Sequence, residues 1–189
     1  PPGRVAKASG WQRPQEFNLV VGIDLKFQRD AAGVQHVFLN ILDIATRYSM
    51  LVRVKDAKAA TIARKLQSNW TTWAGDPDSI IHDQGPEFGE ELAALMEGMG
   101  ARSRVTPTEA PWQNGIVERH GAVLGEIVAM MVETCALAGP DDMKNAAIFA
   151  TKAKNRRITS TGKSARSRVF GTDERWPDGV VGSLEDGEN

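Results

Sequence analysis

Apolar segments separated by short polar breaks open the chain and predict β-strands. Residues 18–27 (NLVVGIDLKF) are almost continuously apolar, a pattern typical of a central strand that is buried on both faces. Residues 36–42 and 48–54 repeat this character after turn-forming residues at 28–33 and after Thr46-Arg47. Three strands on such short connections predict an antiparallel meander.

Helical periodicity follows the meander. A helix over residues 57–73, with Asp56 as its cap, presents one apolar face to the core. That face consists of Ile62, Leu66, Trp70 and Trp73. The two tryptophans are therefore interpreted as core residues and not as a platform on which bases stack.

Two more strands and a crossover come next. Short strands are predicted at 80–82 and 102–105, with a helix between them that begins after 86–88 and ends at Gly100. The strand at 48–54, the helix at 57–73 and the strand at 80–82 in succession make a crossover connection, so a parallel pair joins the antiparallel strands.

The last part of the pattern contains one loop and two helices. Residues 106–115 carry two prolines and an Asn-Gly pair and are predicted to form a loop. Helices are predicted from Ile116 onward and over 143–156, the second capped by Asp141 or Asp142.

Three carboxylates occupy positions in this pattern that suit metal binding. Asp24 lies inside the first apolar strand, where a charge is costly unless it is paired or bound to a metal. Asp83 directly follows the strand at 80–82, and Glu118 lies in the first turn of the helix that starts at Ile116, with 118 − 83 − 1 = 34 residues between the two acids. A carboxylate at a strand end and one at a helix start can converge on one point, and hard divalent cations prefer such oxygen ligands. A purely structural role for Asp24 is the alternative, and the presence of two other acids favours a metal site.

The segment from Phe17 to Thr134 resembles the catalytic core of retroviral and retrotransposon integrases, which are D,D-x-E polynucleotidyl transferases. The resemblance is carried by the three acids in order and by the segment LDIATRY at 42–48. It also includes the GIVER sequence at 115–119. The spacing between Asp83 and Glu118 is one residue shorter than is usual in retroviruses. Ala165 stands where a proline is usual in the stretch that follows the core in long-terminal-repeat retrotransposons.

The resemblance implies a fold, a reaction and a set of site residues. The implied fold is α/β and ribonuclease H-like, a mixed five-stranded sheet flanked by helices. The implied reaction is 3′-end processing followed by DNA strand transfer, assisted by two Mg²⁺ ions with Mn²⁺ as a possible substitute. Asp24 is then expected to bridge both ions, Asp83 to hold one and Glu118 the other. Element-end DNA and target DNA are the implied partners, and a homo-oligomer is expected.

Residues around Glu118 have further predicted roles. Gln113 and Asn114 match the loop positions that contact DNA in the family, although both could be ordinary turn residues, and Arg119 is a candidate phosphate contact. Gly115 is predicted to adopt a conformation that a side chain would resist, which would let the loop close on DNA. A stripe of small residues is predicted to bring the helix close to the sheet. The stripe runs from Glu118 through Gly121, Ala122, Gly125 and Ala129.

Composition and charge divide the chain into three parts. With 189 residues and 41% apolar residues, one domain with a substantial core is expected. Residues 1–16 are interpreted as a linker, 17–157 as the catalytic core and 158–189 as an extension that is first basic and then acidic. The net charge of −1 conceals a block of seven basic and no acidic residues between Lys152 and Arg168. Three members of this block are candidate DNA contacts, namely Lys154, Arg156 and Arg157.

Other residue types narrow the setting. Cys135 is the only cysteine, so no intrachain disulfide can form and a reducing compartment is expected, either the nucleus or a cytoplasmic virus-like particle. The three histidines and Cys135 lack zinc-finger spacing, and no apolar run is long enough for a membrane span, so neither a zinc site nor a membrane is expected. The start without a methionine suggests a piece of a larger protein.

Two alternatives to a retroelement integrase stay open on sequence alone. An insertion-sequence transposase shares the triad and the pattern at 115–119. A domesticated copy that binds DNA or a partner without catalysis is the other, although all three acids are intact. The sequence does not identify the host, the DNA sequences recognised, or the size of an oligomer.

Overall fold

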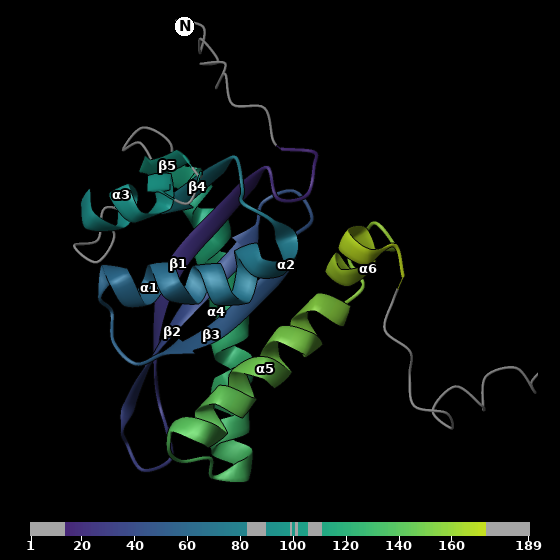
Figure 1. Ribbon diagram of the computed structural model, residues 1–189. Coiled ribbons are helices and arrows are strands. Elements are labelled where there is room, and N and C mark those ends of the chain that lie inside the picture. Colours follow the sequence, from purple (N-terminus) through teal and green to yellow (C-terminus); the bar gives the residue numbers. More distant parts are fainter. Residues whose placement is uncertain (1–13, 83–89, 99, 101, 106–110, 173–189) are drawn as a thin grey trace, which may run out of the picture.

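The computed structural model describes residues 14–82, 90–98, 100, 102–105 and 111–172 (Figure 1). Asp83 lies outside the described residues. The elements in chain order are β1 (Val20–Arg29), β2 (Gln35–Asp43), β3 (Ser49–Val54), α1 (Ala59–Leu66), the π-helical turn η1 (Gln67–Thr71), α2 (Thr72–Ala74), β4 (Ser79–His82), α3 (Glu90–Gly98), β5 (Arg102–Val105), α4 (Pro111–Cys135), α5 (Pro140–Arg156) and α6 (Ala165–Phe170).

The strands form one mixed sheet in the order β3-β2-β1-β4-β5. β1, β2 and β3 pair antiparallel, whereas β4 pairs parallel with β1 and β5 pairs parallel with β4. The predicted meander and the predicted crossover are therefore both confirmed. β1 lies at the centre, which explains its nearly continuous apolar sequence, because such a strand is covered on both faces.

The sheet lies between two layers of helices, because side chains of a strand alternate between its faces. On β1, Val21, Ile23 and Leu25 pack with residues of α1 and α3 in one apolar cluster. The even-numbered positions of β1 face α4, since Val20 belongs to the cluster that contains Val117. A third cluster joins the same side of the sheet to α4 and α5.

The predicted helix over 57–73 is not continuous. It begins at Ala59 and is interrupted by the π-helical turn η1 before α2. A π-helical turn holds one extra residue, so the residues after it lag by roughly 100° relative to an α-helix. Trp70, within the turn, is fully buried. Trp73 comes after the turn, so it lies at the edge of the apolar face and is 40% exposed. Its ring stacks between those of Phe17 and Phe170, with both centroid distances 5.7 Å.

Contacts of α6 extend the packed region beyond residue 157. Phe170, at the end of α6, also meets the ring of Tyr48 edge-on at 5.7 Å, and the guanidinium of Arg166 lies 4.9 Å from the Phe170 ring centroid. The first half of the predicted extension is thus in contact with the core, and Figure 1 shows α6 beyond the end of α5.

The turn between β2 and β3 depends on a buried carboxylate. Asp43 Oδ1 accepts hydrogen bonds from the Thr46 backbone N–H at 2.7 Å and from the Thr46 hydroxyl at 2.6 Å. Asp43 Oδ2 accepts from the backbone N–H of Asn18 at 3.0 Å. Arg47 completes the turn with a φ of 67°, in the left-handed region that non-glycine residues rarely adopt.

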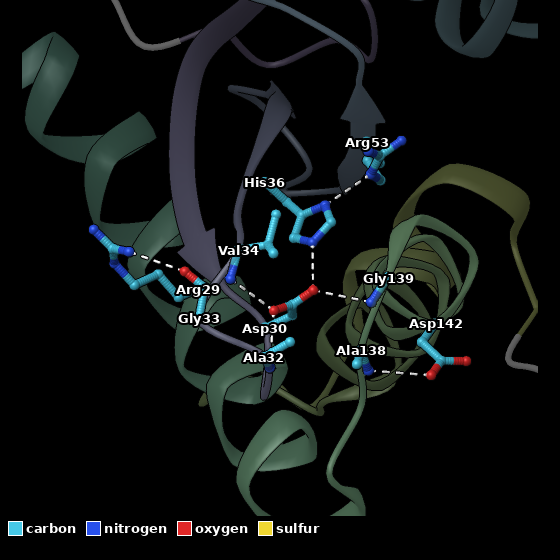
Figure 2. A network of polar contacts seen from close by, with 10 residues as sticks. All are labelled: Arg29, Asp30, Ala32, Gly33, Val34, His36, Arg53, Ala138, Gly139 and Asp142. Atoms are coloured by element: carbon cyan, nitrogen blue, oxygen red, sulfur yellow. Dashed lines mark hydrogen bonds and ion pairs between the residues drawn. The ribbon is translucent and has the colours of Figure 1, made fainter.

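A second buried carboxylate joins the β1–β2 hairpin to the connection between α4 and α5 (Figure 2). Asp30 Oδ2 accepts from the Gly139 backbone N–H and from His36 Nε2, each at 2.9 Å. Arg53 Nε donates to the other ring nitrogen of His36, Nδ1, at 3.2 Å. The bonds from Gly139 first, and then from His36, lower the pKa of Asp30 to about 2. This network ties the sheet to the helical layer that carries Glu118.

Candidate active site

Asp24 lies on the face of β1 that is covered by α4. Gly22, Asp24 and Lys26 alternate along β1 and therefore share this face. A Cβ at Gly22 would lie 2.3 Å from Val117 Cγ2, and a Cβ at Gly121 would lie 2.4 Å from Lys26 Cε. Asp24, between the two contacts, thus faces the turn of α4 that runs from Val117 to Gly121 and contains Glu118.

The close approach of α4 to the sheet was predicted correctly at Gly121 and wrongly at other positions. Among residues 115–135 of α4, whose burial the structure describes, the buried ones are Val117, Gly121, Leu124 and Val128. Ala122 is exposed, and Gly125 and Ala129 are half-buried, so the stripe that faces the sheet is rotated by one residue from the predicted stripe. Glu118 is exposed and directly follows the buried Val117. Its carboxylate is therefore accessible to a ligand that arrives from solvent.

The immediate surroundings of Asp24 include two residues that the sequence reasoning missed. The ammonium of Lys26 lies 2.5 Å from Asp24 Oδ2, and the Asp24 side chain is 14% exposed. Asn40 is opposite Asp24 on β2, is fully buried, and donates from Nδ2 to the carbonyl of Val117 at 3.2 Å. The alternation of β1 could have revealed Lys26, because residues two apart on a strand share a face.

The three predicted acids stand differently in the structure. Asp24 and Glu118 lie on elements that face each other. Asp83 directly follows His82 in the sequence. His82 is buried and ends β4, the strand that pairs with β1. Within the described residues, which include only two of the three acids, no group of three His, Cys, Asp or Glu side chains is positioned to hold a metal ion.

The predicted loop before Glu118 is helical in its second half. α4 begins at Pro111, so the backbone of Gln113, Asn114 and Gly115 belongs to the helix, while the side chains of Gln113 and Asn114 lie outside the described residues. Gly115 does not have a positive φ, and a Cβ built on it meets no atom within 4 Å. The predicted need for glycine at this position is therefore wrong.

The basic block is not uniformly on the surface. Lys154 is only 8% exposed, and its ammonium donates to the backbone carbonyl of Arg47 and to the hydroxyl of Ser49. Lys154 therefore does not lie on the outer surface of α5 beside Arg156 and Arg157, and the prediction that groups it with surface DNA contacts is corrected. Arg156, Arg157 and Arg119 are exposed and stay candidates.

Comparison with known proteins gives a match in structure only. No protein-family model and no curated protein matches the sequence. The HTLV-2 integrase catalytic core domain, solved with magnesium in a trimeric form, matches with a TM-score of 0.64 and 18% identity over 79% of this chain and 95% of that one. The dimeric form of the same domain matches with a TM-score of 0.63 and 19% identity, over 79% of this chain and 94% of that one.

A larger assembly shares the same fold. A chain of the simian T-cell lymphotropic virus intasome, solved with PP2A regulatory subunit B56 gamma, matches with a TM-score of 0.73 and 17% identity. That match covers 88% of this chain and 58% of the intasome chain. The protein is therefore an α/β domain of the ribonuclease H-like class. Within that class it has the fold of a retroviral integrase catalytic core.

One structural property bears on the setting of the domain. None of the helices in the described part of the chain combines the length and the apolar character needed to cross a bilayer.

Proposed function

We propose that this domain is the catalytic core of a retroelement integrase and that it carries out 3′-end processing and DNA strand transfer. The observation that supports this most directly is the placement of Asp24 on the central strand opposite the turn of α4 that bears Glu118. Both acids lie in a domain that has the integrase fold. Asp83 directly follows β4, which pairs parallel with β1.

The donor set fits a hard divalent cation. Asp24 is a carboxylate in an apolar strand, and the ammonium of Lys26 already provides it with a positive partner. We infer that Asp24, Asp83 and Glu118 hold two Mg²⁺ ions, with Mn²⁺ as a substitute, because carboxylate oxygens suit these metals. When bound, such ions supply activation of the attacking oxygen and stabilisation of the leaving 3′ oxygen. The HTLV-2 domain was itself solved with magnesium.

The chain's own residues then have distinct tasks. Val117 and Gly121 seat α4 against β1 and so fix the distance between the strand-borne and the helix-borne carboxylate. Asn40 holds the carbonyl of Val117 and keeps this turn of the helix in place. Arg119, with Gln113 and Asn114, is proposed to bind the DNA backbone near the acids, and Arg156 and Arg157 to bind it further away.

The proposed partners follow from the same reading. Element-end DNA and target DNA are the substrates, and a homo-oligomer is proposed because the matched HTLV-2 domains were solved as a dimer and a trimer. The nucleus or a cytoplasmic virus-like particle is the proposed location.

A strand-transfer assay with Mg²⁺ or Mn²⁺ tests the proposal. Asp83→Asn and Glu118→Gln should each abolish activity, because each removes a charged ligand from the metals. Glu126→Gln is the matched control, since Glu126 is an exposed acid two turns further along α4 and should leave the rate unchanged. Removal of one of several adjacent acids relieves repulsion in the metal-free state, so urea unfolding should find stability level or raised. Near wild-type strand transfer by Asp83→Asn would refute the assignment, and inactivity of the wild-type protein would favour the non-catalytic copy.

A further inference from the structure

A pocket lies beside α4. It is a cavity of about 300 Å³ between α4, the C-terminal end of α5 and the turn from β2 to β3. Its polar wall contains Arg47, His120, Lys154 and Arg157, and its apolar wall includes Val123 and Ile158. We call it the basic pocket. None of the described residues that line it is acidic.

Lys154 is the cation that the fold places deepest in the basic pocket. Its ammonium carries three N–H donors, and the carbonyl of Arg47 and the hydroxyl of Ser49 accept from two of them. Both partners are neutral acceptors, so the charge has no carboxylate among the described residues. Burial first, and then the positive charge of Arg47, lower the pKa of Lys154 to about 7. A buried charge of this kind is costly unless an opposite charge accompanies it.

Two more cations converge on the same cavity from different elements. Arg47, in the turn between β2 and β3, also lines the cavity. Arg157, the residue that directly follows α5, lines the cavity as well. The fold thus brings three like charges to one cavity.

A purely structural role accounts for only part of this arrangement. Lys154 does fasten α5 to the β2–β3 turn. However, the neighbouring Asn155 already fastens the same helix to Ser49, with its Oδ1 accepting from the Ser49 N–H at 2.9 Å and its Nδ2 donating to the Ser49 carbonyl at 2.7 Å. A neutral side chain could complete that attachment without the cost of a buried ammonium. The attachment also gives no reason for Arg47 and Arg157 to share the cavity.

We propose that the basic pocket binds a phosphate oxyanion through Arg47, Lys154 and Arg157. The phosphate oxygens would accept from the two guanidinium groups and from the third N–H of Lys154, and would reduce the repulsion among the three cations. Val123 and Ile158 form the apolar part of the wall beside these cations. The phosphate could be free in solution or part of a nucleic-acid backbone, and both offer the same chemistry.

Binding of inorganic phosphate to the full chain tests this site without any need for metal or strand transfer. Phosphate should raise the unfolding midpoint in a saturable way beyond a chloride control of equal ionic strength. Arg157→Gln and Arg47→Gln should each weaken phosphate binding about tenfold or more, because each removes a charge-assisted hydrogen bond. Arg157 is exposed, so its variant should fold normally. Arg64→Gln, which removes an exposed arginine from α1 outside the pocket, is the matched control and should bind phosphate as the wild type does.

A second arm with short duplex DNA distinguishes the two sources of phosphate. If the pocket takes a backbone phosphate, Arg157→Gln should flatten the plot of log affinity against log salt by about 0.9, and inorganic phosphate should compete with DNA. If it takes free phosphate alone, inorganic phosphate should bind the wild type but should not compete with DNA. The proposal is overturned if phosphate does no more than chloride, or if Arg157→Gln and Arg47→Gln both bind phosphate as tightly as the wild type. A failure of strand transfer would leave this result untouched, so the two proposals fail separately.

Discussion

Gly22→Ala tests the close contact between β1 and α4 on which the candidate active site depends. The added Cβ would lie 2.3 Å from Val117 Cγ2, and 3.4 Å and 3.5 Å from side-chain atoms of Ile44 and Ile81. Ordinary contacts begin at 3.4 Å, so the first distance is too short by 3.4 − 2.3 = 1.1 Å. Val117, Ile44 and Ile81 are all almost completely buried, and a valine in a helix has essentially one rotamer. The helix must therefore move away from the strand.

The expected magnitude combines two opposing terms. Overpacking of a well-filled core costs about 1–3 kcal/mol, and the rigid surroundings place this site at the upper end. Replacement of a strand glycine by alanine returns about 0.5–1 kcal/mol. We therefore expect Gly22→Ala to lower the free energy of unfolding by about 2 kcal/mol. Because Glu118 directly follows Val117, the same movement should also weaken the proposed Mg²⁺ binding and raise the Mg²⁺ concentration needed for activity.

Urea unfolding followed by circular dichroism measures the stability of each variant. Val117→Ala alone should lose roughly 2 kcal/mol, because it removes two buried methyl groups and leaves a cavity. In the double variant the methyl group added at position 22 occupies the space that Val117 vacates, so the loss should be smaller than the sum of the single losses by about 1–2 kcal/mol. Gly125→Ala is the matched control, since the nearest atom to its Cβ, Gln28 Oε1, is 4.0 Å away. It should gain up to about 1 kcal/mol.

Two results would refute this reasoning. One is a free energy of unfolding for Gly22→Ala within about 0.5 kcal/mol of the wild type, which is the usual range for substitutions that disturb nothing. The other is additivity of Gly22→Ala and Val117→Ala, because residues that do not touch contribute independently. Either would mean that α4 is not held against β1 at this position.

Three further predictions concern other parts of the fold and use the same unfolding measurement. The pKa of Asp30 is lowered from 3.8 to about 2, so its stabilising effect is present above pH 4 and is lost as the pH falls toward 2. The gap in urea midpoint between wild type and Asp30→Asn should close over that range, and a constant gap would contradict the network in Figure 2. The pKa of Lys154 is lowered from 10.5 to about 7, so the unfolded chain binds the extra proton between these values and wild-type stability should rise with pH from 7 to 10.5. Lys154→Met should lack this rise, and parallel curves would show that Lys154 is not buried as an ammonium. Gly115→Ala should raise the free energy of unfolding by up to about 1 kcal/mol, because Gly115 is helical and has free space around it; a loss would restore the special conformation that was expected there.

The architecture was largely predictable from periodicity, because burial imposes a period on each element. Alternating and continuous apolar runs predicted β1, β2 and β3, and the helix predicted between the strands at 48–54 and 80–82 indicated that β4 joins the sheet in a parallel pair. Two local features escaped prediction for physical reasons. The π-helical turn at Gln67–Thr71 has no simple sequence signal. The prolines and the Asn-Gly pair at 106–115 led to the prediction of a loop there, although α4 begins at Pro111. Proline suits the first turn of a helix, so the same residue type predicts a helix start as readily as a loop.

The candidate site shows why a motif and its geometry carry different information. The sequence pattern singled out Asp24 in an apolar strand and Glu118 at a helix start, and the fold brings their elements to face each other. The pattern could not show that Lys26 pairs with Asp24, because that contact depends on a slot over Gly121 into which the lysine chain fits. Nor could it separate Lys154 from the other basic residues, since a run of charges looks alike whether its members are exposed or buried. Positions of charge follow from composition, whereas the depth of a charge follows from packing, and depth decides whether a lysine meets DNA, joins two elements or binds an anion.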